Sequence, residues 1–215
     1  MLGDIIESGV IPVTRLTRIF RQGAGSQIAE AAQQINAGRM PRISSPNKQT
    51  DMWAVWDYEP ENSLPRSSRM VAEVAPQLGY DPLKDVQVLT AGHKGVLGTI
   101  NLNLVLQEAL NPASPKTPEV DIADRIFRRG DRVIQMSNDY DLDVFNGDIG
   151  QIIDIRTQGR RKDNARILVA FDDKEVEYSA SEARHLSLAY AISVHKSQGS
   201  EFPVVIFVPT TQNYA

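Results

Sequence analysis

The fold is decided by the stretch Leu188-Ala-Tyr-Ala-Ile-Ser-Val-His-Lys-Ser-Gln-Gly-Ser-Glu-Phe-Pro-Val-Val-Ile-Phe-Val208. An apolar run ending at Ser193 predicts a buried strand, and a second run from Val204 predicts another. The second run is continuously apolar, as expected for a strand covered on both faces of a parallel sheet. Residues 193–201 place hydroxyl, imidazole, ammonium, amide and carboxylate groups between them. Open α/β sheets bind ligands beyond the carboxyl ends of their strands, so this polar turn predicts a binding site.

The first half of the chain alternates between strand and helix patterns. A helix is predicted from an N-cap at Ser26 to a stop at Gly38, because apolar residues recur between them at helical spacing. Strand–helix alternation of this kind predicts an α/β fold with a mostly parallel sheet. The other predicted elements are strands at 10–16, 52–58 and 86–90 and helices at 67–78 and 99–110, with residues 59–65 as a break.

The pattern changes after residues 111–118, a proline-rich linker. Short strands with turns at Asn146-Gly147 and Asp172-Asp173 then predict antiparallel hairpins and a small SH3-like β-barrel. The chain is expected to rejoin the parallel sheet from Leu186. The predicted short strands are 132–136, 150–156, 166–171 and 175–178. The predicted domains are a discontinuous α/β domain at 1–120 and 186–215 and an inserted barrel at 121–185.

Composition narrows the class of protein. The chain has 215 residues, of which 41% are hydrophobic and 23% charged, values typical of a globular protein. It has no cysteine, which excludes disulfides and cysteine-based zinc sites. No signal peptide and no run of about 18 apolar residues is seen, which predicts a cytoplasmic protein. The net charge of −4 means that any nucleic-acid contact must come from local basic patches.

Several segments resemble superfamily 1 helicases. Residues 193–202, Ser-Val-His-Lys-Ser-Gln-Gly-Ser-Glu-Phe, resemble the fifth conserved motif of that superfamily, and the flanking residues resemble its RecD-like branch of 5′-to-3′ DNA helicases. Three more segments follow the family's order: 15–22 resembles the fourth motif, 86–103 the strand, loop and helix after it, and 139–150 the start of the barrel inserted in the second motor domain. The resemblance implies a RecA-like second motor domain, of the P-loop NTPase type, with an SH3-like insert.

The resemblance also implies a fragment of a larger enzyme. The chain contains no Gly-x-x-x-x-Gly-Lys-Ser/Thr loop, and the family's sixth motif is expected just beyond Tyr214. In the intact helicase, of the exodeoxyribonuclease V alpha-subunit type, ATP and Mg²⁺ would bind between two RecA-like domains, so this chain alone is predicted not to hydrolyse ATP. The implied partners are single-stranded DNA, the missing N-terminal RecA-like domain and, as a further candidate, nuclease-complex subunits.

The resemblance assigns nucleotide contacts to Arg21, Gln22, Gly199 and Glu201. Arg21 would be catalytic, because a guanidinium forks onto phosphate oxygens and can stabilise the charge that develops during γ-phosphoryl transfer. The alternative for Arg21 is an ordinary surface salt bridge. No metal-binding residues are predicted. The Asp-rich segment 138–143 lacks the glycine and glutamate positions of a calcium loop. It is predicted to be a turn that positions Tyr140 and Phe145.

Candidate DNA contacts fall in three places. They are Ser193, His195, Lys196 and Gln198 at the start of a short predicted helix; Thr90, His93 and Lys94, with Thr99 as a further donor, in a strand–helix loop; and Arg160, Arg161 and Lys162 within the basic segment 156–166. Each could instead be an ordinary loop or a solvated hairpin. A second basic cluster comprises Arg125, Arg128, Arg129 and Arg132. Trp53 and Trp56 could stack on bases, but a place in the core of a strand is the favoured interpretation.

Two other classes of function stay open. The parent could be a degenerate helicase in which this portion is a non-catalytic module that binds a protein or a nucleic acid through its barrel, since SH3-like folds host many unrelated functions. A protein-binding module would show an exposed aromatic groove on the barrel and no affinity for single strands. The parent could also be another superfamily 1 motor, either Pif-like or relaxase-associated.

Overall fold

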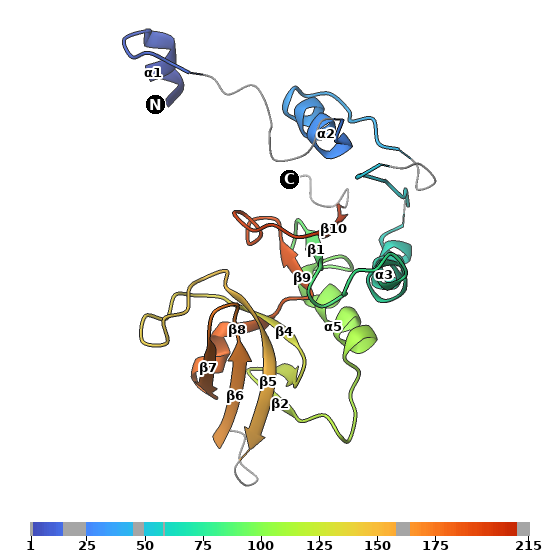
Figure 1. Cartoon of the computed structure of the whole chain (residues 1–215), viewed down its shortest axis with the longest axis vertical. Helices are drawn as coiled ribbons and strands as arrows, with labels where there is room; N and C mark the ends of the chain where they lie inside the picture. Colours follow the sequence, from blue (N-terminus) through green and yellow to red (C-terminus); the bar gives the residue numbers. More distant parts are fainter. Residues whose placement is uncertain (1, 15–24, 45–49, 58, 158–163, 210–215) are drawn as a thin grey trace. The chain divides into compact units, whose positions relative to one another are not determined.

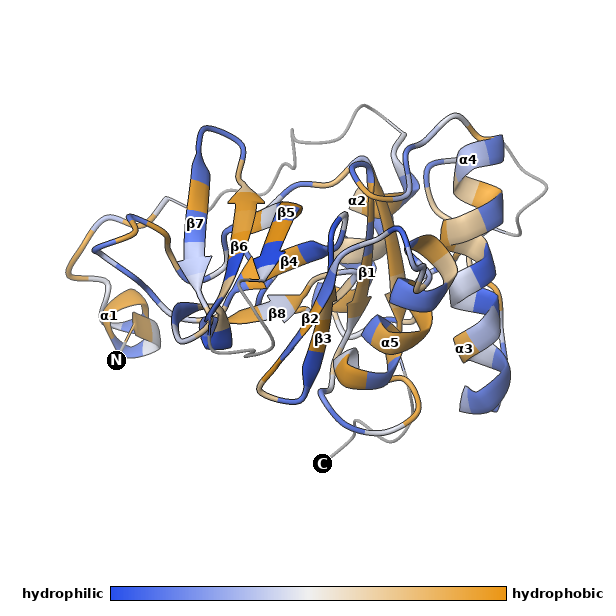
Figure 2. Ribbon diagram, turned by 90° about the horizontal axis from the view of Figure 1, so that it is seen from below, coloured by the Kyte–Doolittle hydropathy of each residue, from blue (hydrophilic) through white to orange (hydrophobic). Residues whose placement is uncertain are grey.

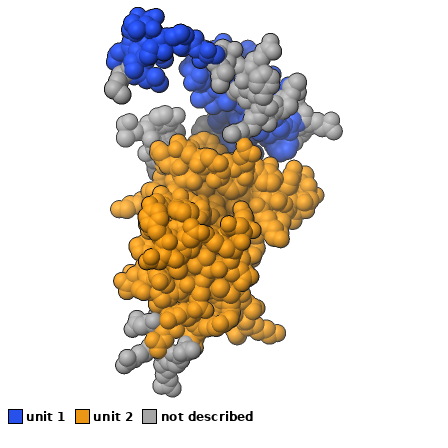
Figure 3. Space-filling view, turned by 60° about the vertical axis from the view of Figure 1, so that its left-hand side comes forward, with its two compact units in different colours: residues 1–56 blue, residues 57–215 orange. Residues whose placement is uncertain are grey.

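The computed structural model describes residues 2–14, 25–44, 50–57, 59–157 and 164–209. The chain divides into two compact units, residues 1–56 and residues 57–215 (Figure 3). Each unit is built from its own contacts and is described separately.

The first unit contains helices α1 (Leu2–Ser8) and α2 (Gln27–Asn36). The prediction for α2 is confirmed: the Ser26 hydroxyl accepts a hydrogen bond of 3.3 Å from the Ala29 amide, and Gly38 follows the helix with a φ of +68°. These are the N-cap and the left-handed stop that the residue types favour. Residues 9–14 form no strand, so the strand predicted from residue 10 is wrong over its described part.

The strand predicted at 52–58 is also wrong over residues 52–57. Trp53 makes an isolated parallel bridge to Ser44, and no ladder extends from it within residues 50–57. The side chains of Trp53 and Trp56 are 47% and 70% exposed, which contradicts a core position for either. An aromatic, alternating run forms a strand only where a neighbouring strand pairs with it.

The second unit contains the predicted parallel sheet, in the order β10–β1–β9 (Figure 1). The strand predicted at 86–90 and the helix predicted at 99–110 are confirmed. The helix predicted at 67–78 begins earlier, at Pro60, because proline is tolerated in the first turn of a helix. The elements are β1 (Val86–Thr90), β9 (Ala191–Ser193), β10 (Val204–Val208), α3 (Pro60–Arg69), the π-helix η1 (Met70–Val74), α4 (Ala75–Gln77) and α5 (Thr99–Leu110).

The predicted short strands form an antiparallel sheet in the order β7–β6–β5–β4–β8. One expectation is corrected: Leu186–Leu188 pairs antiparallel with β4, so the parallel sheet resumes at Ala191 and not at Leu186. The strands of this sheet are β4 (Arg132–Gln135), β5 (Ile149–Thr157), β6 (Ala165–Ala170), β7 (Glu175–Ser179) and β8 (Leu186–Leu188), with the 3-10 helix η3 (Glu182–His185) before β8.

A hairpin that was not predicted precedes this sheet. It comprises β2 (Glu119–Ile122) and β3 (Arg125–Arg128), joined by Ala123 and Asp124. Both turn residues have positive φ, 52° and 60°, a conformation that glycine, asparagine and aspartate favour. Asp124 suits this turn but Ala123 does not, so the turn signal in the sequence is weak.

Most buried apolar residues of the two sheets belong to one core cluster. Val88 of β1 and Leu102 of α5 belong to the same cluster as Phe127 and Ile152 of the antiparallel strands. Figure 2 shows hydrophobic residues along β1, β6 and α5, the elements that cover this core. The antiparallel strands are thus packed onto the parallel sheet and share its interior.

Candidate nucleic-acid interface

The two polar segments singled out in the sequence leave the parallel sheet at the same edge. Strands β1 and β9 are parallel neighbours, and their last residues, Thr90 and Ser193, are partners in register. The segment carrying His93 and Lys94 follows β1 directly, and the segment carrying His195 follows β9. Residues separated by about a hundred positions therefore lie beyond adjacent carboxyl ends, where open sheets bind ligands.

The loop after β1 is held in shape by hydroxyl groups and a glycine. The Thr90 hydroxyl is buried and donates 2.7 Å to the Leu97 carbonyl, so it supports the loop and is not a free donor, which corrects its expected role. Thr99, also buried, lies 3.1 Å from His93 Nδ1 through its hydroxyl oxygen. A Cβ added at Gly98 would lie 2.5 Å from a backbone carbonyl oxygen of the same loop. His93 and Lys94 are exposed on this frame.

The segment after β9 is a series of turns and not the predicted short helix. The Lys196 amide donates 2.9 Å to the carbonyl of Ser193, and the turns end at Gly199 with a φ of +89°. Because no helix begins at Ser193, there is no helix N-terminus at this point to bind a phosphate. Ser193 is buried and closes the turn, while His195 and Gln198 are exposed.

Lys196 is joined to the antiparallel part of the molecule. Its ammonium group donates a hydrogen bond to Asn146 Oδ1, and Asn146 lies in the connection between β4 and β5. The connection thereby reaches the turn after β9. Sequence reasoning missed this contact because 50 positions separate the partners.

Of the remaining predicted site residues, two belong to the described part of the chain and five do not. Glu201 is exposed and lies three residues before the start of β10, and Gly199 forms the turn that precedes it. The expected contacts Arg21, Gln22, Arg160, Arg161 and Lys162 lie outside the described residues.

The second basic cluster holds the fold together. Arg125 donates to the carbonyls of Leu186 at 2.6 Å and Arg184 at 2.9 Å. Arg132 donates 3.0 Å to the carbonyls of Leu83 and Val86, at the amino end of β1. Burial lowers the pKa of both guanidinium groups.

Arg128 makes a third structural contact. Its guanidinium is buried against Glu108 at 3.1 Å and Glu119 at 3.3 Å. Of the four arginines in the cluster, Arg129 is the one whose side chain is exposed. The cluster is therefore not a surface for phosphate.

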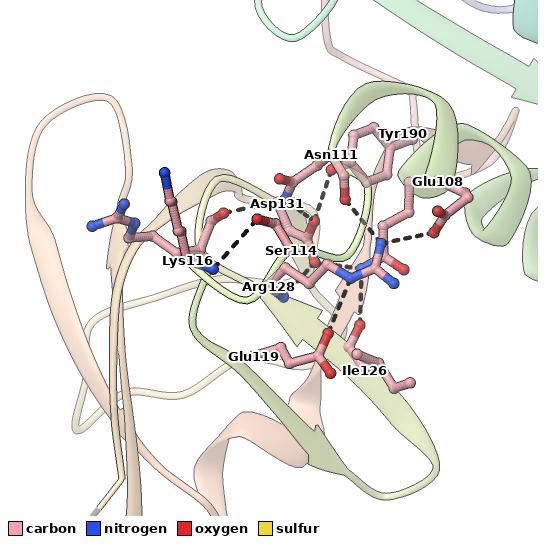
Figure 4. A network of polar contacts seen from close by, with 11 residues as sticks. Glu108, Asn111, Ser114, Lys116, Glu119, Ile126, Arg128, Asp131 and Tyr190 are labelled. Atoms are coloured by element: carbon pink, nitrogen blue, oxygen red, sulfur yellow. Dashed lines mark hydrogen bonds and ion pairs between the residues drawn. The ribbon is translucent and has the colours of Figure 1, made fainter.

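A buried carboxylate network lies where the two sheets meet (Figure 4). Asp131 is fully buried and accepts from the Gln107 amide at 2.6 Å, the Asn111 amide at 2.7 Å, the Arg128 backbone N–H at 2.7 Å and the Tyr190 hydroxyl at 2.8 Å. Burial raises the pKa of Asp131 against the effect of these hydrogen bonds, and burial also raises the pKa of Tyr190. This network could not be predicted from the sequence, since an aspartate after a glycine resembles an ordinary turn.

In the described part of the chain, no group of three or more histidine, aspartate or glutamate side chains could hold a metal ion. Among the same residues, every helix is too short or too polar to cross a membrane.

Comparisons with known proteins agree with this architecture. Residues 102–171 match the family model of the ATP-dependent RecD-like DNA helicase SH3 domain, and residues 188–215 match that of the UvrD-like helicase C-terminal domain. The chain is 36% identical over 197 residues to the ATP-dependent RecD2 DNA helicase of Deinococcus radiodurans. That match covers 92% of this chain and 25% of the relative, so the chain spans a quarter of the relative's length.

A solved structure shares the fold. The crystal structure of the Pif1 helicase from Bacteroides in complex with ADP-AlF3 and ssDNA matches with a TM-score of 0.51 at 17% identity, over 90% of this chain and 45% of that one. At this identity the match shows a shared fold and no more. The SH3-domain match and the RecD2 relative thus show that the chain is similar to a segment of the RecD-like superfamily 1 DNA helicases.

Proposed function

We propose that this chain provides single-stranded DNA contacts and half of the ATP site of an ATP-dependent 5′-to-3′ DNA helicase. The observation that carries the proposal is the register of Thr90 with Ser193, which brings the segments after β1 and β9 to one edge of the sheet. The relative from Deinococcus radiodurans, named as an ATP-dependent DNA helicase, supports it. The proposed activity would be exercised in the cytoplasm, and nuclease-complex subunits are candidate partners of the whole enzyme.

The DNA track would consist of cationic and polar groups on these two segments. Lys94 and Lys196 supply ammonium groups, and His93, His195 and Gln198 supply hydrogen-bond donors beside them. Each lysine that neutralises a phosphate releases a counterion, so binding should weaken steeply with salt. Thr90 and Ser193 would act by holding the segments in place, since both are buried.

The half-site for ATP would lie on the same domain. Arg21 would stabilise the transferring phosphoryl group, and the nucleotide contacts assigned by the resemblance are Gln22, Gly199 and Glu201. Mg²⁺ and the phosphate-binding loop would belong to the other RecA-like domain, because this sequence has no Gly-x-x-x-x-Gly-Lys-Ser/Thr loop. Closure and reopening of the cleft between the two domains would move the single strand.

The test is fluorescence anisotropy of a labelled oligo-dT titrated with the chain at several salt concentrations. We expect salt-sensitive binding, with the slope of log K against log salt reduced by about 0.7 in Lys196→Ala. Lys84→Ala is the matched control, because Lys84 is exposed at the amino end of β1, away from the proposed track. Equal slopes for Lys196→Ala and wild type would remove Lys196 from the track. Absence of binding at low salt would refute DNA contact by this chain.

A further inference from the structure

The connection between β4 and β5 presents a pair of exposed aromatic rings. Tyr140 is 77% exposed and Phe145 is 43% exposed. Their ring centroids lie 6.2 Å apart with an interplanar angle of 77°, an edge-to-face arrangement. Large aromatic side chains are normally buried, so a paired and exposed set needs a reason.

The backbone around the pair is rigidly held. Asp139 and Val144 exchange backbone hydrogen bonds of 2.8 and 2.9 Å, and Val144 is fully buried beneath the connection. The Asp139 carboxylate also accepts from the amides of Asp141 and Leu142. A preorganised surface loses little entropy when a ligand binds, which favours a binding role for the rings.

A relay of hydrogen bonds connects the aromatic pair to Lys196. Asn138 Nδ2 donates 3.3 Å to the Tyr140 hydroxyl, and Asn138 Oδ1 accepts 2.9 Å from the Asn146 amide. The side chain of Asn146 in turn accepts from the Lys196 ammonium. The rings therefore stand beside a cation of the proposed DNA track.

The charges around the rings indicate which part of a nucleotide would lie there. The Asp139 carboxylate and the exposed Asp141 flank Tyr140, while the Asp148 carboxylate accepts 2.8 Å from the Phe145 amide. Negative charge disfavours a phosphate at the rings but not an uncharged base. The Lys196 ammonium offers the complementary site for the phosphate.

We propose that Tyr140 and Phe145 form a stacking platform for an unpaired base of the single strand whose backbone passes Lys196. This inference rests on the proposed DNA-binding function and adds a base contact to it. Base–aromatic stacking tolerates any sequence, because every base has a π face. The platform thus distinguishes a strand that has bases from a bare sugar–phosphate chain. It does not distinguish one base from another.

The experiment compares oligo-dT with an abasic oligonucleotide of the same length by anisotropy. The wild type should bind oligo-dT about tenfold more tightly than the abasic strand. Tyr140→Ala should lose most of that preference with unchanged affinity for the abasic strand, and Tyr140→Phe should keep it. Tyr80→Ala is the control, since Tyr80 is an exposed ring at the amino end of β1. Lys196→Ala should weaken binding of both strands equally.

Other outcomes separate this inference from the function it rests on. Equal affinity of the wild type for both strands, or an unchanged preference in Tyr140→Ala, would overturn the stacking platform and leave the DNA track in place. Absence of binding to either strand would overturn both. In that case a protein would become the candidate occupant of the aromatic pair.

Discussion

The hydroxyl of Tyr190 donates a hydrogen bond of 2.8 Å to Asp131 Oδ1, across 59 positions of sequence. Asp131 lies just before β4, and Tyr190 lies just before β9. The bond therefore joins the start of the antiparallel sheet to the strand that carries the turn with Lys196. Both residues are buried, so the junction of the two sheets contains a polar contact within an apolar core.

Replacing Asp131 by alanine should destabilise the second unit strongly. The substitution removes the acceptor of the buried Tyr190 hydroxyl and one of the two acceptors of each side-chain amide of Gln107 and Asn111, which costs about 3 kcal/mol of unfolding free energy. The loss of unfolding free energy is measured by urea unfolding followed by far-UV circular dichroism. Asp173→Ala, on an exposed turn, should change stability by no more than about 0.5 kcal/mol. Similar losses in the two variants would argue against the network.

Arg132→Ala should reduce stability without altering DNA binding. The guanidinium satisfies the carbonyls of Leu83 and Val86, so its removal should cost about 2 kcal/mol in unfolding free energy. Because Arg132 is buried, the salt slope for oligo-dT should equal that of the wild type. A reduced slope in a variant that remains folded would mean that Arg132 contacts phosphate after all.

Gly98→Ala should distort the loop that carries Lys94. The new Cβ would lie 2.5 Å from the Lys94 carbonyl oxygen and 2.6 Å from that of His93, and backbone atoms cannot move aside easily. The expected cost is about 1–3 kcal/mol in unfolding free energy, together with weaker binding of oligo-dT. Gly3→Ala is the control, because a Cβ there meets nothing within 4 Å. A fully stable Gly98→Ala would show that the loop has room to adjust.

The pKa of Asp51 should be measurably low and should depend on Ser26. The hydrogen bond from the Ser26 hydroxyl, with that from the Gln27 amide, lowers the pKa of this carboxyl below its ordinary 3.8. A lowered folded pKa gives stability that is present above the ordinary value and lost as the pH falls through the folded one. NMR titration should find the low pKa in the wild type and a higher one in Ser26→Ala. An identical pKa in the two proteins would rule out this cause.

Elements that carry their own apolar pattern could be predicted from the sequence. The strand at Val86–Thr90 and the helix at Thr99–Leu110 each carry their own apolar pattern, which their environment then satisfies. Residues 52–57 carry a similar pattern but find no ladder, and only tertiary pairing distinguishes the two cases. The Ala123-Asp124 turn has positive φ at an alanine, which does not favour it, so Asp124 alone gave only a weak signal for the hairpin.

The candidate site was predictable as a set of segments but not as a set of contacts. Polar groups after two apolar strands indicate a shared edge, and the register of Thr90 with Ser193 confirms it. Whether a hydroxyl or a guanidinium is free or already bonded depends on distant partners. Thr90 and Arg132 both resembled nucleic-acid contacts in sequence, and both are occupied by backbone carbonyls.

Only Ala189 and Tyr190 separate β8 from β9. Two residues span at most about 7 Å, so this crossing has no slack. A displacement of the connection between β4 and β5 would therefore pass through β4 and β8 to β9, the strand that ends at Ser193. A flexible tether would dissipate the same displacement. The SH3-like insert is in this sense joined to the parallel sheet without a flexible linker at this crossing.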